Sequence, residues 1–134
     1  MGGDVTESNA GKAGRRLLAV DDNVESAELV GRIAQKCGYD VRVASTAGSV
    51  QRELVGWRPD VLTLDLCMPD GDAIDLFPLL QEANFDGRVV IISGHDDWLR
   101  KSASKLAAAR GINIVGDMEK PLDVAKLRQL LLAL

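Results

Sequence analysis

Residues 61–65 read Val61-Leu62-Thr63-Leu64-Asp65, an apolar run that ends in a single carboxylate. A short run of this kind without polar alternation is typical of a strand buried on both faces of a parallel sheet. Ligands of open α/β sheets bind outside the carboxyl ends of the strands. The run therefore predicts a buried strand that delivers Asp65 to the edge of the sheet where chemistry takes place.

Polar residues also follow other strand-like runs of the chain. Asp21 and Asp22 close the first apolar run, Ser93 follows the fourth, and Lys120 comes after the last, just before Pro121. Because the carboxyl ends of parallel strands meet at one edge, we expect these side chains to converge with Asp65 on one polar site.

Apolar runs alternate with longer segments of helical period after residue 14. This alternation predicts a doubly wound α/β fold, in which a five-stranded parallel sheet lies between two layers of helices. Asn23 is the expected N-cap of the first helix, Gly38 its stop, and Pro59 ends the second. The expected strands are residues 16–20, 40–44, 61–65, 88–92 and 112–115, and the expected helices are 24–37, 46–55, one from about 72, 97–110 and one from about 124 to the end.

Length and composition predict one packed domain. The chain has 134 residues, of which 46% are hydrophobic and 27% charged, as in ordinary globular proteins. Residues 1–14 are rich in small and polar side chains without apolar periodicity, so we expect a flexible tail followed by a domain over residues 15–134. The formal net charge of −4 and the scattered basic residues argue against a direct nucleic-acid surface.

No stretch of the sequence is long and apolar enough for a membrane span, and the N-terminus lacks the apolar core of a signal peptide. Cys37 and Cys67 are too few and too isolated for a disulfide framework or a zinc site, which fits a reducing compartment. These features predict a cytoplasmic protein without a membrane partner.

Three carboxylates packed at one edge repel one another unless a cation joins them. Mg²⁺ is the natural choice, because it takes oxygen ligands from one or two carboxylates together with waters and a phosphate oxygen. We expect Asp22 and Asp65 to be direct ligands and Asp21 to hold a coordinated water. Lys120 and Ser93 would orient the oxygens of a phosphoryl group, with Asp65 as the nucleophile.

With these residues in place, the chain resembles a response-regulator receiver domain of bacterial two-component signalling. The resemblance covers residues 15–134. It rests on the joint spacing of four motifs: Asp21-Asp22, Leu64-Asp65-Leu66-Cys67-Met68-Pro69-Asp70-Gly71, Ser93-Gly94 and Lys120-Pro121.

The resemblance implies a flavodoxin-like (βα)5 fold and a phosphoacceptor function. Asp65 would take a phosphoryl group from a histidine kinase or a histidine phosphotransfer protein, as in a phosphorelay, and the change would alter what the surface binds. The main-chain carbonyl of Cys67 would join the carboxylates as a ligand of Mg²⁺. A cis Lys120-Pro121 bond and a homodimer through the last two helices are implied as well.

The chain departs from the family pattern at Asp117, where many receivers carry an aromatic residue that moves when the hydroxyl residue engages the phosphoryl group. A charged side chain does not fit an apolar slot, so another readout is expected, through residues 94–96 or the helix that follows. His95 and Trp98 lie there, and Trp98 fits either a half-buried or an exposed, partner-binding position.

Two other functions remain open. One is a pseudo-receiver that acts only as an interaction scaffold, since a fold does not guarantee an activity. The other is a phosphatase with an aspartyl-phosphate intermediate, which needs a second aspartate at the position of Cys67. We expect self-phosphorylation and self-dephosphorylation only, not a metabolic enzyme, in a module that either stands alone or belongs to a longer protein.

Overall fold

The computed structural model describes residues 14–66, 75–94 and 97–134. Five parallel strands form one sheet in the order β2-β1-β3-β4-β5, which confirms the predicted doubly wound fold. The strand order reverses between β1 and β3, and this is the position where open α/β sheets bind ligands. The strands are β1 (Arg16–Val20), β2 (Asp40–Ala44), β3 (Val61–Asp65), β4 (Arg88–Ser93) and β5 (Asn113–Glu119).

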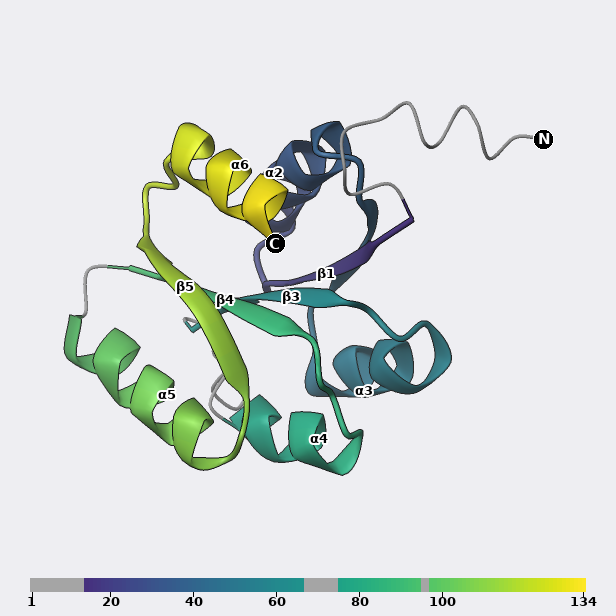
Figure 1. Cartoon of the computed structure of the whole chain (residues 1–134), viewed down its shortest axis with the longest axis vertical. Coiled ribbons are helices and arrows are strands. Elements are labelled where there is room, and N and C mark those ends of the chain that lie inside the picture. The colour runs from purple at the N-terminus through teal and green to yellow at the C-terminus, as the bar shows by residue number, and fades with distance from the viewer. Residues whose placement is uncertain (1–13, 67–74, 95–96) are drawn as a thin grey trace.

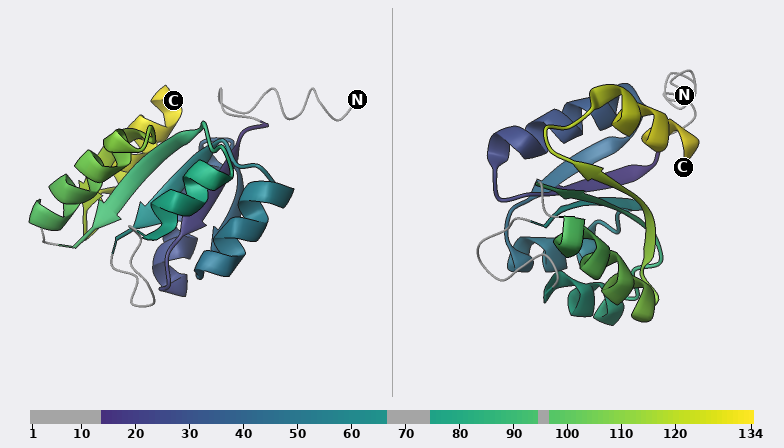
Figure 2. Two further views of the ribbon diagram at one scale, coloured as in Figure 1. Left: turned by 90° about the horizontal axis from the view of Figure 1, so that it is seen from below. Right: turned by 90° about the vertical axis from the view of Figure 1, so that its left-hand side faces the viewer.

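Helices cover both faces of the sheet, as Figure 1 shows. Two of them, α2 and α6, lie on one face, and α3, α4 and α5 lie on the other. The turned views in Figure 2 show the same three layers. The helices are α2 (Val24–Lys36), α3 (Ala47–Gly56), α4 (Leu76–Glu82), α5 (Asp97–Ala109) and α6 (Val124–Ala133).

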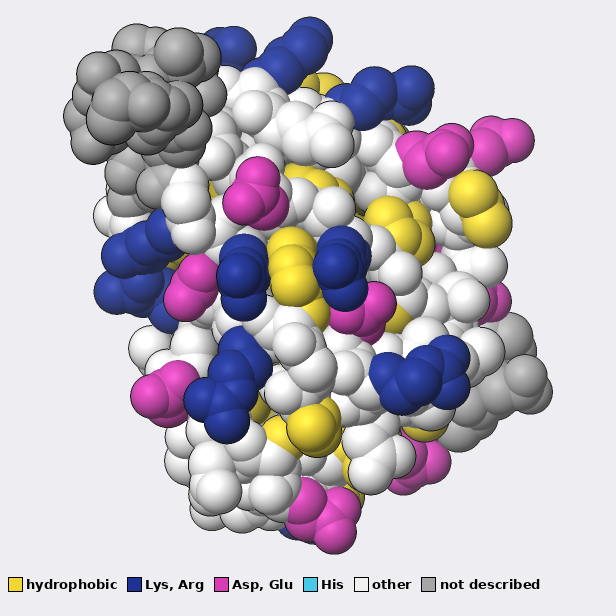
Figure 3. Space-filling view, turned by 90° about the vertical axis from the view of Figure 1, so that its right-hand side faces the viewer, with side chains coloured by type: hydrophobic (Ala, Val, Ile, Leu, Met, Phe, Trp, Pro, Cys, Tyr) yellow, Lys and Arg dark blue, Asp and Glu magenta, His cyan; other side chains and the backbone are white. Residues whose placement is uncertain are grey.

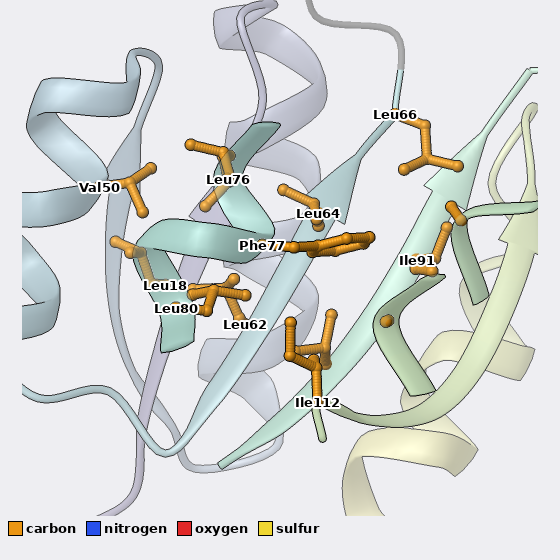
Figure 4. Close-up of a cluster of buried hydrophobic side chains, with 14 of the residues drawn as sticks. Leu18, Val50, Leu62, Leu64, Leu66, Leu76, Phe77, Leu80, Ile91 and Ile112 are labelled. Atoms are coloured by element: carbon orange, nitrogen blue, oxygen red, sulfur yellow. The ribbon is translucent and has the colours of Figure 1, made fainter. Parts of the chain in front are cut away.

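The core consists of two clusters, one on each side of the sheet. Successive strand residues point to opposite faces, so Leu17 belongs to the cluster beneath α2 and α6, and Leu18 to the other. In the second cluster Phe77 of α4 lies over the sheet beside Leu64 and Ile91 (Figure 4). Full burial of a side chain like Phe77 contributes about 1.5 to 3 kcal/mol, so this packing fixes the layers around the site.

Local signals start and end the helices as predicted. The Asn23 side chain accepts a hydrogen bond from the Ser26 N–H at 3.0 Å and caps α2. Gly38 follows this helix with a φ of +97°, a conformation that glycine adopts without strain. Arg58 lies two residues after α3 with a φ of +58°, directly before Pro59.

Two expectations need correction, and a third falls partly outside the described residues. The last strand was predicted over residues 112–115, but β5 runs from Asn113 to Glu119 because its pairing with β4 continues beyond a register shift near Val90. The helical period also predicts Leu29 on the apolar face of α2, but Leu29 is 37% exposed. The helix predicted from about Asp72 begins outside the described residues, which include α4 from Leu76.

Within the described residues, the helices are all too short or too polar to cross a membrane.

Candidate functional site

The carboxyl ends of β1, β3 and β5 bring two carboxylates and one ammonium group together. The Lys120 Nζ donates a hydrogen bond to Asp65 Oδ2 at 2.8 Å, and the same nitrogen lies 3.7 Å from Asp21 Oδ2. The backbone directs this contact, since Lys120 follows directly after the last residue of β5. The predicted convergence of these three side chains is therefore present.

Asp22 completes a cluster of three carboxylates. One oxygen each from Asp21, Asp22 and Asp65 lies within 4.8 Å of the others. Asp21 and Asp65 are buried, with 5% and 2% of their surface exposed, whereas Asp22 is open to solvent. Main-chain contacts fix Asp21, because its N–H donates to the Ala44 carbonyl at 3.1 Å and its Oδ1 accepts the Asn23 N–H at 2.9 Å.

Burial raises the pKa of Asp21 from 3.8 to about 6, and the hydrogen bond and charge of Asp65 add to this effect. The Asn23 N–H and the Lys120 ammonium act in the opposite direction but do not offset the rise. The cluster therefore holds more negative charge than its own donors stabilise. Three carboxylates with one solvent-facing member fit a hard divalent cation such as Mg²⁺.

Ser93 ends β4 at the same edge of the sheet and is fully buried. Its Oγ has no hydrogen-bond partner among the described residues, and such orphaned hydroxyls are uncommon in protein interiors. Its main-chain carbonyl accepts the Lys120 N–H at 2.7 Å, which joins the ends of β4 and β5. A ligand oxygen bound beside Asp65 is one group that this hydroxyl is suited to meet.

An apolar hollow of about 240 Å³ adjoins the carboxylates, between α2 and the segment after β5. Asp21 and Lys120 form one end of it, and Leu29, Val30 and Leu122 line its side. A surface of this kind, next to a charged site, is suited to hold the apolar side chains of a protein partner.

Other predicted features have mixed outcomes. The Lys120-Pro121 bond is cis, as the resemblance implied. Cys67, whose carbonyl was expected among the metal ligands, and His95 lie outside the described residues. Trp98 is 74% exposed at the start of α5, which removes the half-buried alternative.

Sequence reasoning missed the partner of Asp117. The Arg100 Nε lies 3.4 Å from Asp117 Oδ1, so the charged residue at the aromatic position is held by a guanidinium from α5. The helical period gave a usable signal, because Arg100 stands three and seven residues before Ala103 and Ala107, both buried against the sheet.

Comparison with known proteins agrees with this geometry. A family model described as response regulator receiver domain matches residues 17–132. The chain is 27% identical over 114 residues to the DNA-binding transcriptional regulator NtrC of Rhizobium meliloti (strain 1021), a match that spans 85% of this chain and 22% of that protein.

A second curated relative is the protein-glutamate methylesterase/protein-glutamine glutaminase of Bdellovibrio bacteriovorus, 32% identical over 115 residues that span 83% of this chain and 31% of that protein. The chain thus covers less than a third of these two relatives. Among solved structures, a response regulator from Colwellia psychrerythraea matches with a TM-score of 0.78 at 27% identity, over 89% of this chain and 94% of that one.

Proposed function

Because this chain belongs to the response regulator receiver domain family, whose model covers residues 17–132, we propose that Asp65 is its phosphoacceptor. The phosphoryl group comes from a phosphohistidine of a histidine kinase or a histidine phosphotransfer protein. The observation that carries the proposal is the 2.8 Å contact between Lys120 Nζ and the buried carboxylate of Asp65, within a cluster of three carboxylates.

The transfer is an in-line displacement at phosphorus. A carboxylate oxygen of Asp65 attacks the phosphorus atom and forms the new O–P bond. The P–N bond to the donor histidine breaks, and its electron pair stays with the imidazole. The ring, protonated on its other nitrogen, leaves as neutral histidine, and Asp65 carries an acyl phosphate.

Two side chains are placed to stabilise the phosphoryl oxygens. Lys120 already contacts Asp65 and exchanges this partner for a phosphoryl oxygen as negative charge develops there. The Ser93 hydroxyl donates a hydrogen bond to another oxygen, which gives its buried Oγ the partner that it lacks among the described residues.

The same carboxylates are suited to hold Mg²⁺. Asp22 and Asp65 would ligate it directly, Asp21 would hold one of its waters, and the family resemblance adds the main-chain carbonyl of Cys67. When bound, Mg²⁺ neutralises charge on the phosphoryl oxygens and the carboxylates. The raised pKa of Asp21 supports this assignment, because the metal-free cluster is short of positive charge.

The phosphodonor is a protein that docks beside the site. The apolar hollow between α2 and the segment after β5 opens next to Lys120, and Val24 and Val124 stand exposed at the starts of α2 and α6. A helix that presents its phosphohistidine to Asp65 could bury apolar side chains there.

A homodimer through α5 and α6 is a further expectation, and Leu132, 41% exposed on α6, supports it. A shift in elution volume on phosphorylation would reveal such a dimer, and an unchanged volume would count against it.

Incubation with acetyl phosphate and Mg²⁺ tests the proposal without a cognate kinase. We expect the wild-type protein to form a retarded band on a phosphate-binding gel, with at most one phosphoryl group per chain. Asp65→Asn removes the nucleophile, so its band should be absent. Asp60→Asn is the matched control, because it changes the carboxylate directly before the amino end of β3. It should be labelled like the wild type.

Two outcomes would favour the alternatives. Equal labelling of wild type and Asp65→Asn would move the acceptor elsewhere, and no labelling of either would support a scaffold role. Sustained hydrolysis of small phosphate esters, rather than stoichiometric labelling, would support a phosphatase.

A further inference from the structure

Arg100 bridges two carboxylates of β5. Its Nε lies 3.4 Å from Asp117 Oδ1 and its Nη1 lies 3.3 Å from Glu119 Oε1. The guanidinium side chain is only 14% exposed, whereas the two carboxylate side chains are 49% and 52% exposed. A basic group that is this well covered keeps more of its attraction than a surface pair, because less water screens it.

The bridge lies beside the residues that would contact the phosphoryl group. Glu119 pairs in register with Ser93, and Asp117 pairs with Ile91. The Lys120 N–H, one residue after Glu119, donates to the Ser93 carbonyl at 2.7 Å. The end of β4, the end of β5 and the first turns of α5 are thus joined through one set of contacts.

Arg100 also connects α5 to this set across the sequence. Helix α5 begins at Asp97, four residues after Ser93, and Arg100 is in its first turn. A displacement of Ser93 toward an oxygen on Asp65 would act on the end of β5 through the paired ends of β4 and β5, and so on the partners of Arg100. The ion pairs span 3.3 to 3.4 Å across the α5–β5 interface, so a movement of one element relative to the other would lengthen them.

We propose that Arg100 is a positioning residue whose bridge to Asp117 and Glu119 holds α5 on β5 in the unphosphorylated form, and that phosphorylation of Asp65 weakens this bridge. The inference rests on the proposed function of Asp65. Because coupling between two equilibria is reciprocal, loss of the bridge raises the population of the conformation that the phosphorylated protein adopts. We expect this conformation to accept the phosphoryl group faster, so the labelling rate reports its population.

The bridge borders a surface through which this change can reach a partner. Arg100, Asp117 and Glu119 line a hollow of about 450 Å³ that continues to Asp123 and Lys126 near the start of α6. Both carboxylate side chains are already about half exposed, so movement of the guanidinium away from them makes the charge of this hollow more negative. The ion pair thereby takes the place of the aromatic readout that the sequence lacks at position 117.

Arg100→Met tests the inference, because it keeps much of the side-chain volume and removes the charge. We expect its initial rate of labelling by acetyl phosphate to rise about two- to fivefold, the range that corresponds to a partly exposed ion pair. Arg100→Lys restores a positive charge and should return the rate to within about a factor of two of wild type. Lys101→Met, an exposed neighbour on the same helix, is the matched control and should leave the rate unchanged.

A structural role alone would lower the thermal midpoint of Arg100→Met without raising its labelling rate. Asp117→Asn should also raise the rate, and the double variant should add less than the sum of the two changes. If Arg100→Met does not fold, Asp117→Asn supplies the test, since Glu119 then still holds the guanidinium.

The outcomes separate this inference from the function on which it rests. Suppose that the wild type is labelled, but Arg100→Met and Asp117→Asn are labelled no faster than the wild type. This result overturns the proposed role of the bridge and leaves Asp65 as the acceptor. Unlabelled wild type overturns the proposed function and the bridge with it.

Discussion

The two ends of the sheet differ in how their polar groups are satisfied. At the carboxyl end, Asp21 and Asp65 are buried together with one ammonium between them, and the Ser93 hydroxyl lacks a partner among the described residues. At the amino end, the Arg16 N–H donates to Asp60 Oδ2 at 2.9 Å and its guanidinium donates to the Trp57 carbonyl. One end is electrostatically incomplete, and the other is arranged for stability.

A single aromatic ring organises the amino end. The guanidinium carbons of Arg16 and Arg42 lie 5.7 and 4.9 Å from the centre of the Trp57 ring, and Arg42 also pairs with Glu53 at 2.9 Å. Figure 3 looks onto the side of the molecule that carries β1 and α3, where Lys and Arg side chains alternate with acidic and hydrophobic ones. The contrast leaves uncompensated charge at the carboxyl end, where we propose that phosphoryl transfer takes place, whereas these charges of the amino end have partners.

The largest effect is expected at the carboxyl end, from Lys120→Met. Loss of the ammonium beside Asp65 removes the main positive charge that the protein offers the transferred group, so the rate of labelling by acetyl phosphate should fall about a hundredfold. Initial rates from phosphate-binding gels give the comparison. Lys126→Met on α6 serves as control, and a Lys120→Met rate within a factor of about three of wild type would remove Lys120 from the reaction.

At the amino end, Trp57→Ala should cost stability and leave the chemistry intact. The ring packs against the core cluster below α3 and holds two guanidinium groups, so we expect unfolding free energy to fall by about 2 kcal/mol. Urea denaturation measures this loss. Trp98→Ala, at an exposed tryptophan, should change stability by less than about 0.5 kcal/mol. A large drop in the labelling rate of folded Trp57→Ala would contradict the separation of the two ends.

The smallest effect is a pH-dependent gain in stability from Asp21→Asn without metal. The pKa of Asp21 is about 6 in the folded protein against 3.8 for the free group, so between these values the folded state holds more protons than the unfolded one. Wild-type stability therefore falls as pH rises through this window, and the penalty is complete above it. Asp21→Asn should gain about 1 kcal/mol near pH 7 and only a small part of this near pH 4.

Urea unfolding with EDTA at the two pH values checks this prediction. Asp40→Asn, at the exposed start of β2, is the matched control from the amino end and should show no such window. A lower stability of Asp21→Asn than of wild type near neutral pH in EDTA would mean that the carboxylates do not oppose one another.

The elements that could be predicted from sequence are those that local signals determine. The strands 16–20, 40–44 and 61–65 have the predicted bounds. The first and third are apolar runs that end at a carboxylate, and the second alternates Val41 and Val43 with polar residues. Strand β5 was predicted too short, since Gly116 and Asp117 interrupt its apolar pattern. A Cβ on Gly116 would lie 2.7 Å from Leu130 Cδ2, so α6 packs closely against β5 at this glycine. This packing explains a glycine inside the strand, and the sequence alone does not reveal it.

The candidate site followed from topology, and the ion pairs did not. Parallel strands bring their carboxyl ends together, so Asp21, Asp65 and Lys120 could be grouped from their positions after apolar runs. The contacts of Arg100 with Asp117 and of Arg16 with Trp57 depend on how a helix or loop lies against a distant strand. The helical period could place Arg100 on the sheet-facing side of its helix, but no local pattern encodes which residue of a distant strand it meets.

The most direct test of the account is the position of the acyl phosphate itself. After labelling with acetyl phosphate and Mg²⁺, borohydride reduction converts an aspartyl phosphate into homoserine, and peptide mass spectrometry locates the change. We expect homoserine at position 65, dependent on Mg²⁺ and absent when EDTA is added first. Homoserine at position 21 or 22, or none in a protein that carries label, would contradict it.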